Sequence, residues 1–282
     1  MLGAAVVDAW AAEAEVAASD VEPRAGQDRV DVADADAFAA AVEDFGPDLL
    51  VNLAAETDLE VCEREPERAW AANAHGAEHG GRIAQRLDIP YVFISTAGIF
   101  GGEKDVYSDG DTPDPLTVYA RSKLAGERFV QDHVRRHFVL RAGWMMGGGP
   151  GVDKKFVEKL HAQLRRGVTT IHAVTDLFGS PTYTRDFARG MVRVVREAPY
   201  GTYNQVCHGP ASRYDVAVAF VELLGLTGRV DVVPVTSAHF ADTYFAHRPR
   251  SEQLRNDRLA ALGLDTMRPW REALAEYAAA FR

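Results

Sequence analysis

The stretch "IPYVFIST" (residues 89–96) is a continuous apolar run that ends in a serine and a threonine. A short run without alternating polar residues is typical of a strand buried on both faces of a parallel sheet. "PDLLVNLAA" (47–55) and "HFVLRAGW" (137–144) have the same character. Ligands bind at the carboxyl ends of the strands in an open parallel sheet, so we expect Ser95 and Thr96 to lie at a binding edge.

Amphipathic segments separate these strands and predict helices at 35–45, 61–87 and 117–136. Further short strands are expected at 14–20 and 28–34, after an opening apolar stretch with helical character. Strands that alternate with helices predict βαβ units. We therefore expect an α/β fold with a Rossmann-like parallel sheet, helices on both faces and a smaller C-terminal lobe.

The pattern loosens after about residue 145, where "MMGGGPG" (145–151) predicts a turn-forming connection. The remaining expected elements are helices at 152–166, 184–197, 212–225 and 268–282, and strands near 202–206 and 230–233. We expect residues 1–145 to form the sheet domain. Residues 146–282 are expected to form mainly a ligand-binding lobe, with segments near 184–210 returning to the core. The cleft between the two is the expected ligand site.

Composition narrows the class of protein. The 282 residues carry a net charge of −10, which argues against a nucleic-acid partner. No apolar run approaches the roughly 18 residues of a membrane span, and the first residues lack the basic flank of a signal peptide. We expect a cytoplasmic protein with two reduced, half-buried thiols, Cys62 and Cys207.

The stretch "VYARSKLAGE" (118–127) carries the strongest chemical signal. Tyr119 and Lys123 are four residues apart and share one face of the predicted helix. An ammonium group beside a phenol lowers the pKa of the phenol, and a tyrosine tuned in this way can transfer a proton to a reacting oxygen. The alternative is a surface Tyr–Lys pair, with the Ser-Thr pair of residues 95–96 capping the end of a strand.

The combination of a buried strand ending in Ser-Thr, a glycine-containing loop and Tyr-x-x-x-Lys on a helix resembles the extended short-chain dehydrogenase/reductases that modify nucleotide sugars. Further stretches resemble the dTDP-4-dehydrorhamnose reductase family over nearly the whole chain. They are "DLLVNLAAETDLEVCEREPERAWAANAHGA" (48–77), "YARSKLAGE" (119–127), "RAGWMMGGG" (141–149), "DLFGSPTYTRDFA" (176–188), "RPRSEQL" (248–254) and "WREAL" (270–274).

The resemblance implies an NAD(P)-binding sheet domain and a catalytic set. Tyr119 would protonate the oxygen as the C4 ketone of a nucleotide-linked 6-deoxysugar is reduced, and Thr96 would bind the carbonyl. Lys123 would hold the nicotinamide ribose and lower the pKa of Tyr119. The hydride would come from NADPH or NADH, because no side chain supplies one.

The resemblance also implies binding residues and a nucleotide-sugar substrate. Besides Tyr119 and Lys123, the cofactor-binding residues would be Gly3, Asp20, Asp31, Val32, Ala54, Ala55 and Asn73. The substrate-binding residues would be Trp144, Pro181, Thr182 and Arg248. No residue identifies a metal site, and the family is compatible with a homodimer.

Several positions depart from the family's pattern. Ala97 and Gly98 stand where an Asp-Tyr pair usually follows Ser-Thr, Leu177 replaces a glutamine, and Lys155-Phe156 replaces Asn-Phe. "STAGIFGG" (95–102) is closer to the strand end of nucleotide-sugar epimerases and dehydratases. A different deoxysugar, epimerase or dehydratase chemistry, and a non-catalytic regulatory subunit on the same fold all stay open. The last has a parallel in a regulatory subunit of methionine adenosyltransferase, which resembles the same family.

The first residues, "MLG", fit the end of the family's Gly-x-x-Gly-x-x-Gly turn, with Gly3 as its third glycine. The first strand and two glycines of this pattern are then missing. Either Met1 is an internal methionine of a longer protein, or the protein has lost normal dinucleotide binding. Asp20 falls where a ribose contact belongs and favours NADH, whereas Arg24 nearby suits the 2′-phosphate of NADPH.

Overall fold

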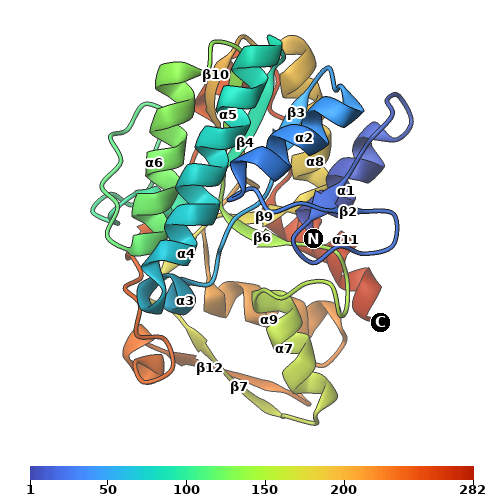
Figure 1. The fold of residues 1–282 in the computed structure, drawn as a ribbon. Helices are drawn as coiled ribbons and strands as arrows, with labels where there is room; N and C mark the ends of the chain where they lie inside the picture. The colour runs from blue at the N-terminus through green and yellow to red at the C-terminus, as the bar shows by residue number, and fades with distance from the viewer.

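A computed structural model describes residues 1–282 and shows an α/β fold with two parts (Figure 1). The larger part contains a parallel sheet in the order β10-β5-β4-β3, and a smaller lobe holds α7, α9, β7 and β12 below it. The sheet strands are β3 (Leu50–Asn52), β4 (Tyr91–Thr96), β5 (His137–Ala142) and β10 (Gly201–Asn204). The expected Rossmann-like architecture, with a parallel sheet and helices, is confirmed.

Helices cover both faces of this sheet. Successive side chains of a strand point to opposite faces, so the apolar residues of β4 need packing partners on each side. Tyr91 and Phe93 of β4 pack against α5 (Gly76–Leu87) and α6 (Val118–His133). Val92, between them, joins the main core with α8 (Thr184–Glu197). This main core also includes α1 (Leu2–Trp10) and α11 (Trp270–Ala278), and α1 packs against α8 (Figure 1).

The edge of the sheet at β3 differs from the expectation. β1 (Ser19–Asp20) and β2 (Asp28–Arg29) pair in parallel with each other, but neither pairs with β3. β3 is therefore hydrogen-bonded on one side only, and Leu50 and Val51 are partly exposed. The expected strands at 14–20, 28–34 and 47–55 were too long, and the last is not buried on both faces.

The single helix expected at 61–87 is wrong. The segment forms α3 (Leu59–Arg64), α4 (Pro66–Trp70), a π-helical turn (Ala71–His75) and α5. Pro66 begins α4 because proline has no N–H for the preceding helix and suits a first helical position. The π-turn then carries the chain into α5 without a break.

The smaller lobe and its connections are built from short elements. Its helices are α7 (Phe156–Arg165) and α9 (Arg213–Leu223), whereas α10 (Asp257–Ala261) packs against β10 of the main sheet. Its strands are β6 (Trp144–Met146), β7 (Thr170–Val174), β8 (Phe178–Gly179), β9 (Pro181–Tyr183), β11 (Ala211–Ser212), β12 (Asp231–Val235) and β13 (Ser251–Glu252). β6 pairs in parallel with β9, and β13 in parallel with β8. α2 (Ala35–Phe45) covers the sheet domain beside α5.

No helix in residues 1–282 is both long and apolar enough to cross a membrane. Cys62 and Cys207 are free thiols, as expected. They are fully rather than half buried, with 0% and 1% of their surface exposed. Free cysteine behaves as a small apolar side chain, and Cys62 packs with Ala69 and Val118.

Candidate active site

Thr96 and Tyr119 meet at the carboxyl end of β4. Thr96 is the last residue of β4, and its hydroxyl accepts a hydrogen bond from the Gly98 N–H at 3.1 Å. Tyr119 lies in the first turn of α6, which Thr117 caps. A Cβ atom added to Gly98 would lie 3.4 Å from Thr96 Oγ1 and 3.5 Å from Tyr119 Cε1, so both side chains border the same small space.

Lys123 lies one helical turn beyond Tyr119 and is 3% exposed. Its ammonium lies 4.1 Å from the centre of the Phe93 ring and donates no hydrogen bond within the protein. Burial lowers the pKa of Lys123 to about 7, although the Glu127 carboxylate opposes this shift. A buried ammonium without an oxygen acceptor is a group that a bound hydroxyl would satisfy.

The pKa of Tyr119 differs from the expectation. Burial raises the pKa of Tyr119 to about 12, while the Thr96 hydroxyl opposes the shift and the Glu252 carboxylate adds to it. Lys123 is not among the groups that shift this pKa, so the expected lowering by Lys123 is wrong for the protein alone. Loss of hydration on burial is the largest cause of the raised pKa of Tyr119.

A buried ion pair fixes α6 on the sheet beneath these residues. Arg141 of β5 donates from Nε to Glu127 of α6 at 3.1 Å, and both side chains are almost fully buried. Arg141 also donates to the backbone carbonyl of Asp109. The pair therefore sets the position of α6, on which Tyr119 and Lys123 lie.

Ala54 and Ala55 lie in the segment that follows β3, and Asn73 of the π-helical turn bonds to this segment. Asn52 Oδ1 accepts from the Ala54 N–H at 3.0 Å, and its amide donates to the Tyr91 hydroxyl at 2.9 Å. Asn73 exchanges two hydrogen bonds with the Glu56 backbone and donates to Ser122 Oγ on α6. Asn73 is fully buried, so it shapes this segment through its internal contacts.

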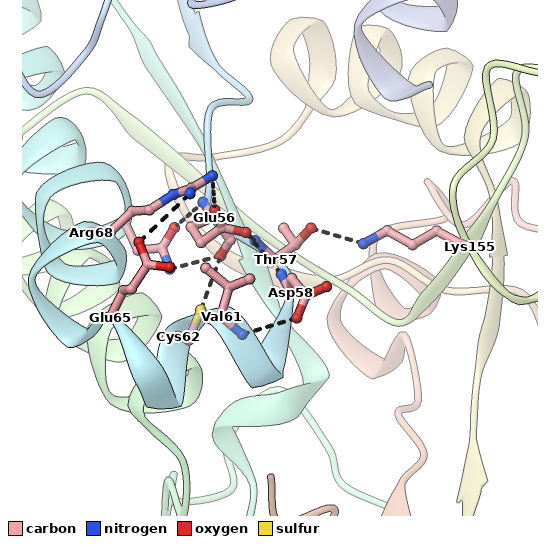
Figure 2. A network of polar contacts seen from close by, with 9 residues as sticks. Glu56, Thr57, Asp58, Val61, Cys62, Glu65, Arg68 and Lys155 are labelled. Atoms are coloured by element: carbon pink, nitrogen blue, oxygen red, sulfur yellow. Dashed lines mark hydrogen bonds and ion pairs between the residues drawn. The ribbon is translucent and has the colours of Figure 1, made fainter. Parts of the chain in front are cut away.

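Figure 2 shows how the loop after β3 is held. The Glu56 carboxylate accepts from the Thr57 and Asp58 N–H groups and forms an ion pair with Arg68 at 2.8 Å. Lys155, just before α7 in the smaller lobe, reaches across and donates to Thr57 Oγ1 at 2.8 Å. Burial is the main cause of a lowered pKa for Lys155.

The cofactor-binding residues expected from the first 32 positions lie on separate segments. A Cβ atom on Gly3 would lie 3.9 Å from Leu53 Cδ1, which places the start of α1 beside the end of β3. Asp20 and Asp31 are exposed, and each caps its own turn by accepting a backbone N–H. Val32 packs against α5 at Gly76.

Trp144 anchors the opposite side of the site. Its indole N–H donates to Glu252 Oε2 at 2.7 Å. The Arg213 guanidinium stacks 3.7 Å from the centre of the Trp144 ring and 4.9 Å from that of Phe156. Trp144, Phe156, Arg213 and Pro181 line a small cavity together with Met145, Met146, Val157 and Val216.

Thr182 and Arg248 are held by contacts within the protein. The Thr182 hydroxyl is 0% exposed, accepts from the Gly143 N–H at 3.1 Å and donates to the Ser180 carbonyl. Arg248 pairs with Glu60 of α3 at 2.8 Å and so joins the smaller lobe to the sheet domain. The Thr182 hydroxyl therefore has no free donor for a ligand, and it holds the segments that form β6 and β9 together.

Four residues near the site have no role that the sequence alone predicts. Asn52, Arg213 and Glu252 carry no signal by themselves, since each acquires its partners from distant segments. Lys155 stands out in the sequence only as a departure from the family's pattern. No group of three or more His, Cys, Asp and Glu side chains in residues 1–282 is arranged to hold a metal ion.

Comparison with known proteins gives consistent results. A family model described as "RmlD substrate binding domain" matches residues 1–282. The dTDP-4-dehydrorhamnose reductase of Mycolicibacterium smegmatis is 35% identical over 253 residues, which are 89% of this chain and 75% of that protein. Among solved structures, a dTDP-4-dehydrorhamnose reductase from Clostridium acetobutylicum superimposes with a TM-score of 0.90 at 30% identity, over 99% of this chain and 95% of that one. The Bacillus anthracis enzyme of the same name, in complex with NADP, gives a TM-score of 0.82 at 27% identity, over 88% and 86% of the two chains.

Proposed function

The chain belongs to the RmlD substrate binding domain family, and from this membership we propose that it is an NAD(P)H-dependent reductase of a nucleotide-linked 4-keto-6-deoxysugar. The observation that carries the proposal is the convergence of Thr96 Oγ1 and the Tyr119 ring on one small space at the end of β4. Lys123 lies one turn away with an unpartnered ammonium. Relatives named dTDP-4-dehydrorhamnose reductase support the reaction class.

The residues fit a nicotinamide cofactor at the carboxyl edge of the sheet. Lys123 offers an ammonium that lacks an oxygen partner, which suits the hydroxyls of the nicotinamide ribose. Ala54 and Ala55, in the segment after β3, have small side chains and are partly exposed. The first turn of α1, at Gly3, carries the partial positive charge of a helix N-terminus and suits a pyrophosphate. When bound, NADPH or NADH supplies the hydride.

The side chains of this site have separate roles in the proposed reaction. The hydroxyls of Thr96 and Tyr119 donate hydrogen bonds to the ketone oxygen and orient it. Because the pKa of Tyr119 is raised to about 12, the phenol is protonated at neutral pH and can act as a general acid. Tyr119 gives its proton to the oxygen as the carbonyl carbon is reduced, while Lys123 holds the nicotinamide ribose.

The smaller lobe supplies groups for a nucleotide sugar. Trp144 and Pro181 offer apolar surface beside the reacting groups, and Arg213 and Lys155 are cations without a carboxylate partner within hydrogen-bond distance. Cations in this position suit an anionic diphosphate despite the protein's net charge of −10. Arg248 keeps the lobe against α3 through Glu60.

The test is a turnover assay of the purified chain with dTDP-4-dehydrorhamnose and either reduced nicotinamide. We expect one nicotinamide to be oxidised for each ketone reduced, with a 4-hydroxy product by NMR. A change in the sugar without net nicotinamide oxidation indicates an epimerase or dehydratase instead. No reaction with any 4-keto-6-deoxysugar nucleotide, in a protein that co-purifies with a partner, contradicts the proposal and favours the regulatory subunit.

A further inference from the structure

Glu252 enters the site from β13, a segment far from the other reacting groups in sequence. β13 pairs with β8, and Glu252 lies opposite Gly179. A Cβ atom on Gly179 would lie 2.2 Å from the Trp144 ring, so this glycine allows the ring to lie flat over β8. In that position the Trp144 indole donates to Glu252 Oε2 at 2.7 Å and fixes the carboxylate.

The second oxygen of Glu252 faces the reacting groups. Oε1 accepts no hydrogen bond from the protein. A Cβ atom on Gly98 would lie 3.1 Å from Glu252 Oε1, beside the Thr96 hydroxyl and Tyr119 Cε1 at 3.4 and 3.5 Å. Three functional groups from β13, β4 and α6 therefore border the position that a side chain of residue 98 would occupy, and glycine leaves that position unfilled.

The electrostatic surroundings allow this acceptor to stay free. Burial raises the pKa of Glu252, while the Trp144 hydrogen bond and the charges of Arg213 and Arg248 oppose the shift. Neither arginine bonds to the carboxylate: Arg248 is engaged by Glu60 and the Ala246 carbonyl, and Arg213 stacks on Trp144. Oε1 of Glu252 is therefore left without a hydrogen-bond partner in the protein.

We propose that Glu252 determines substrate specificity by accepting, at Oε1, a hydrogen bond from the hydroxyl on the carbon next to the ketone that is reduced. The inference rests on the proposed function, in which Thr96 and Tyr119 hold the ketone oxygen. Oxygens on neighbouring ring carbons of a sugar lie about one hydrogen-bond length apart, so the adjacent hydroxyl reaches the space bordered by Oε1. In a 4-keto-6-deoxysugar this hydroxyl is on C3, because C5 carries the methyl group.

The substitution Glu252→Gln tests this role with little change of shape. The Trp144 N–H still needs an acceptor, so the amide oxygen turns to Trp144 and the NH2 group faces the reacting space. The variant thus keeps the support of Trp144 but replaces an acceptor with a donor. Glu222→Gln, on the exposed face of α9, is the matched control with the same change of charge.

The measurement is kcat/KM for a dTDP-linked 4-keto-6-deoxysugar with a C3 hydroxyl and for its 3-deoxy counterpart. For Glu252→Gln we expect a loss of about 10- to 100-fold on the first substrate, the range of a hydrogen bond to a charged group, and less than about 3-fold on the second. Glu222→Gln should match the wild type on both. Equal losses on the two substrates, or no loss, overturn the proposal, because a purely structural role through Trp144 does not depend on the C3 hydroxyl.

A binding experiment separates this inference from the proposed function. If the wild type reduces neither ketone, the corresponding 4-hydroxy products with and without the C3 hydroxyl are titrated by calorimetry. Tighter binding of the C3-hydroxylated product, lost in Glu252→Gln, supports the role of Glu252 although the reductase function fails. Equal binding of both products, or binding of neither, overturns the inference.

Discussion

The Lys155 ammonium donates a hydrogen bond to the Thr57 hydroxyl at 2.8 Å and joins the smaller lobe to the loop after β3. This contact crosses from the sheet domain to the segment before α7 (Figure 2). Lys155 is partly buried and has no carboxylate partner within hydrogen-bond distance, and burial lowers its pKa.

We expect Lys155→Met to raise KM for the nucleotide sugar by about 10-fold, with little change in kcat, because a charged hydrogen bond or ion contact of this kind contributes about 1.5 kcal/mol or more. Steady-state kinetics with saturating reduced nicotinamide measure the effect. Lys154→Met is the matched control, since the neighbouring side chain is exposed. An equal rise in KM for both variants would contradict a specific contact of Lys155, because it would follow from the loss of one positive charge alone.

Tyr119→Phe removes the proposed proton donor and leaves the ring in place. We expect kcat to fall by about 10²- to 10⁴-fold, the usual contribution of general acid catalysis. Binding of NADPH or NADH, followed by nicotinamide fluorescence, should change little. Turnover by this variant at the wild-type rate would exclude Tyr119 as the acid.

Gly98→Ala places a methyl group in the space between Thr96, Tyr119 and Glu252. Because the new Cβ would lie 3.1–3.5 Å from these groups, we expect kcat/KM to fall by about 10-fold or more, as for other displaced catalytic contacts. The melting temperature should change little, since Gly98 does not have a positive φ. Gly110→Ala is the control, because its Cβ would meet no atom within 4 Å. Unchanged kinetics in Gly98→Ala would contradict the proposal that the substrate binds between Thr96, Tyr119 and Glu252.

The stability of the protein should depend on pH through Lys123. Its pKa in the folded protein, about 7, lies below the ordinary value of 10.5. Between these values the unfolded chain binds more protons than the folded one, so this group makes stability rise with pH from about 7 to 10.5. In Lys123→Met we expect this component to disappear. Urea unfolding of both proteins at several pH values measures it, and an identical pH dependence would show that Lys123 is not neutral when folded.

The pair formed by Arg141 and Glu127 should be structural. Arg141→Met leaves the Glu127 carboxylate buried without its partner, and we expect the free energy of unfolding to fall by about 3–5 kcal/mol. The double variant Glu127→Leu with Arg141→Met should recover much of this loss, since it removes the unpaired charge. Denaturant titration tests both. A double variant no more stable than Arg141→Met would contradict this account.

Local sequence signals predicted the bounds of several helices accurately. α2 begins after Asp34, whose side chain accepts a hydrogen bond from the Ala37 N–H, and it ends at Phe45, just before Gly46 with φ of 64°. α8 runs over the expected residues 184–197. The helices of the segment 61–87 were less predictable, because Pro66 and the π-turn at 71–75 divide a segment whose amphipathic pattern predicts one helix.

The sequence by itself determined the alternation of strands and helices and the family, and it proposed Thr96, Tyr119 and Lys123 as the reacting side chains, because these depend on residue type and on short spacings along the chain. Only the tertiary structure decided that β3 is hydrogen-bonded on one side, that burial raises the pKa of Tyr119, and that Glu252 faces Gly98. These properties depend on which distant segments meet and on how much water they exclude. Neither is encoded in the local pattern of any one segment.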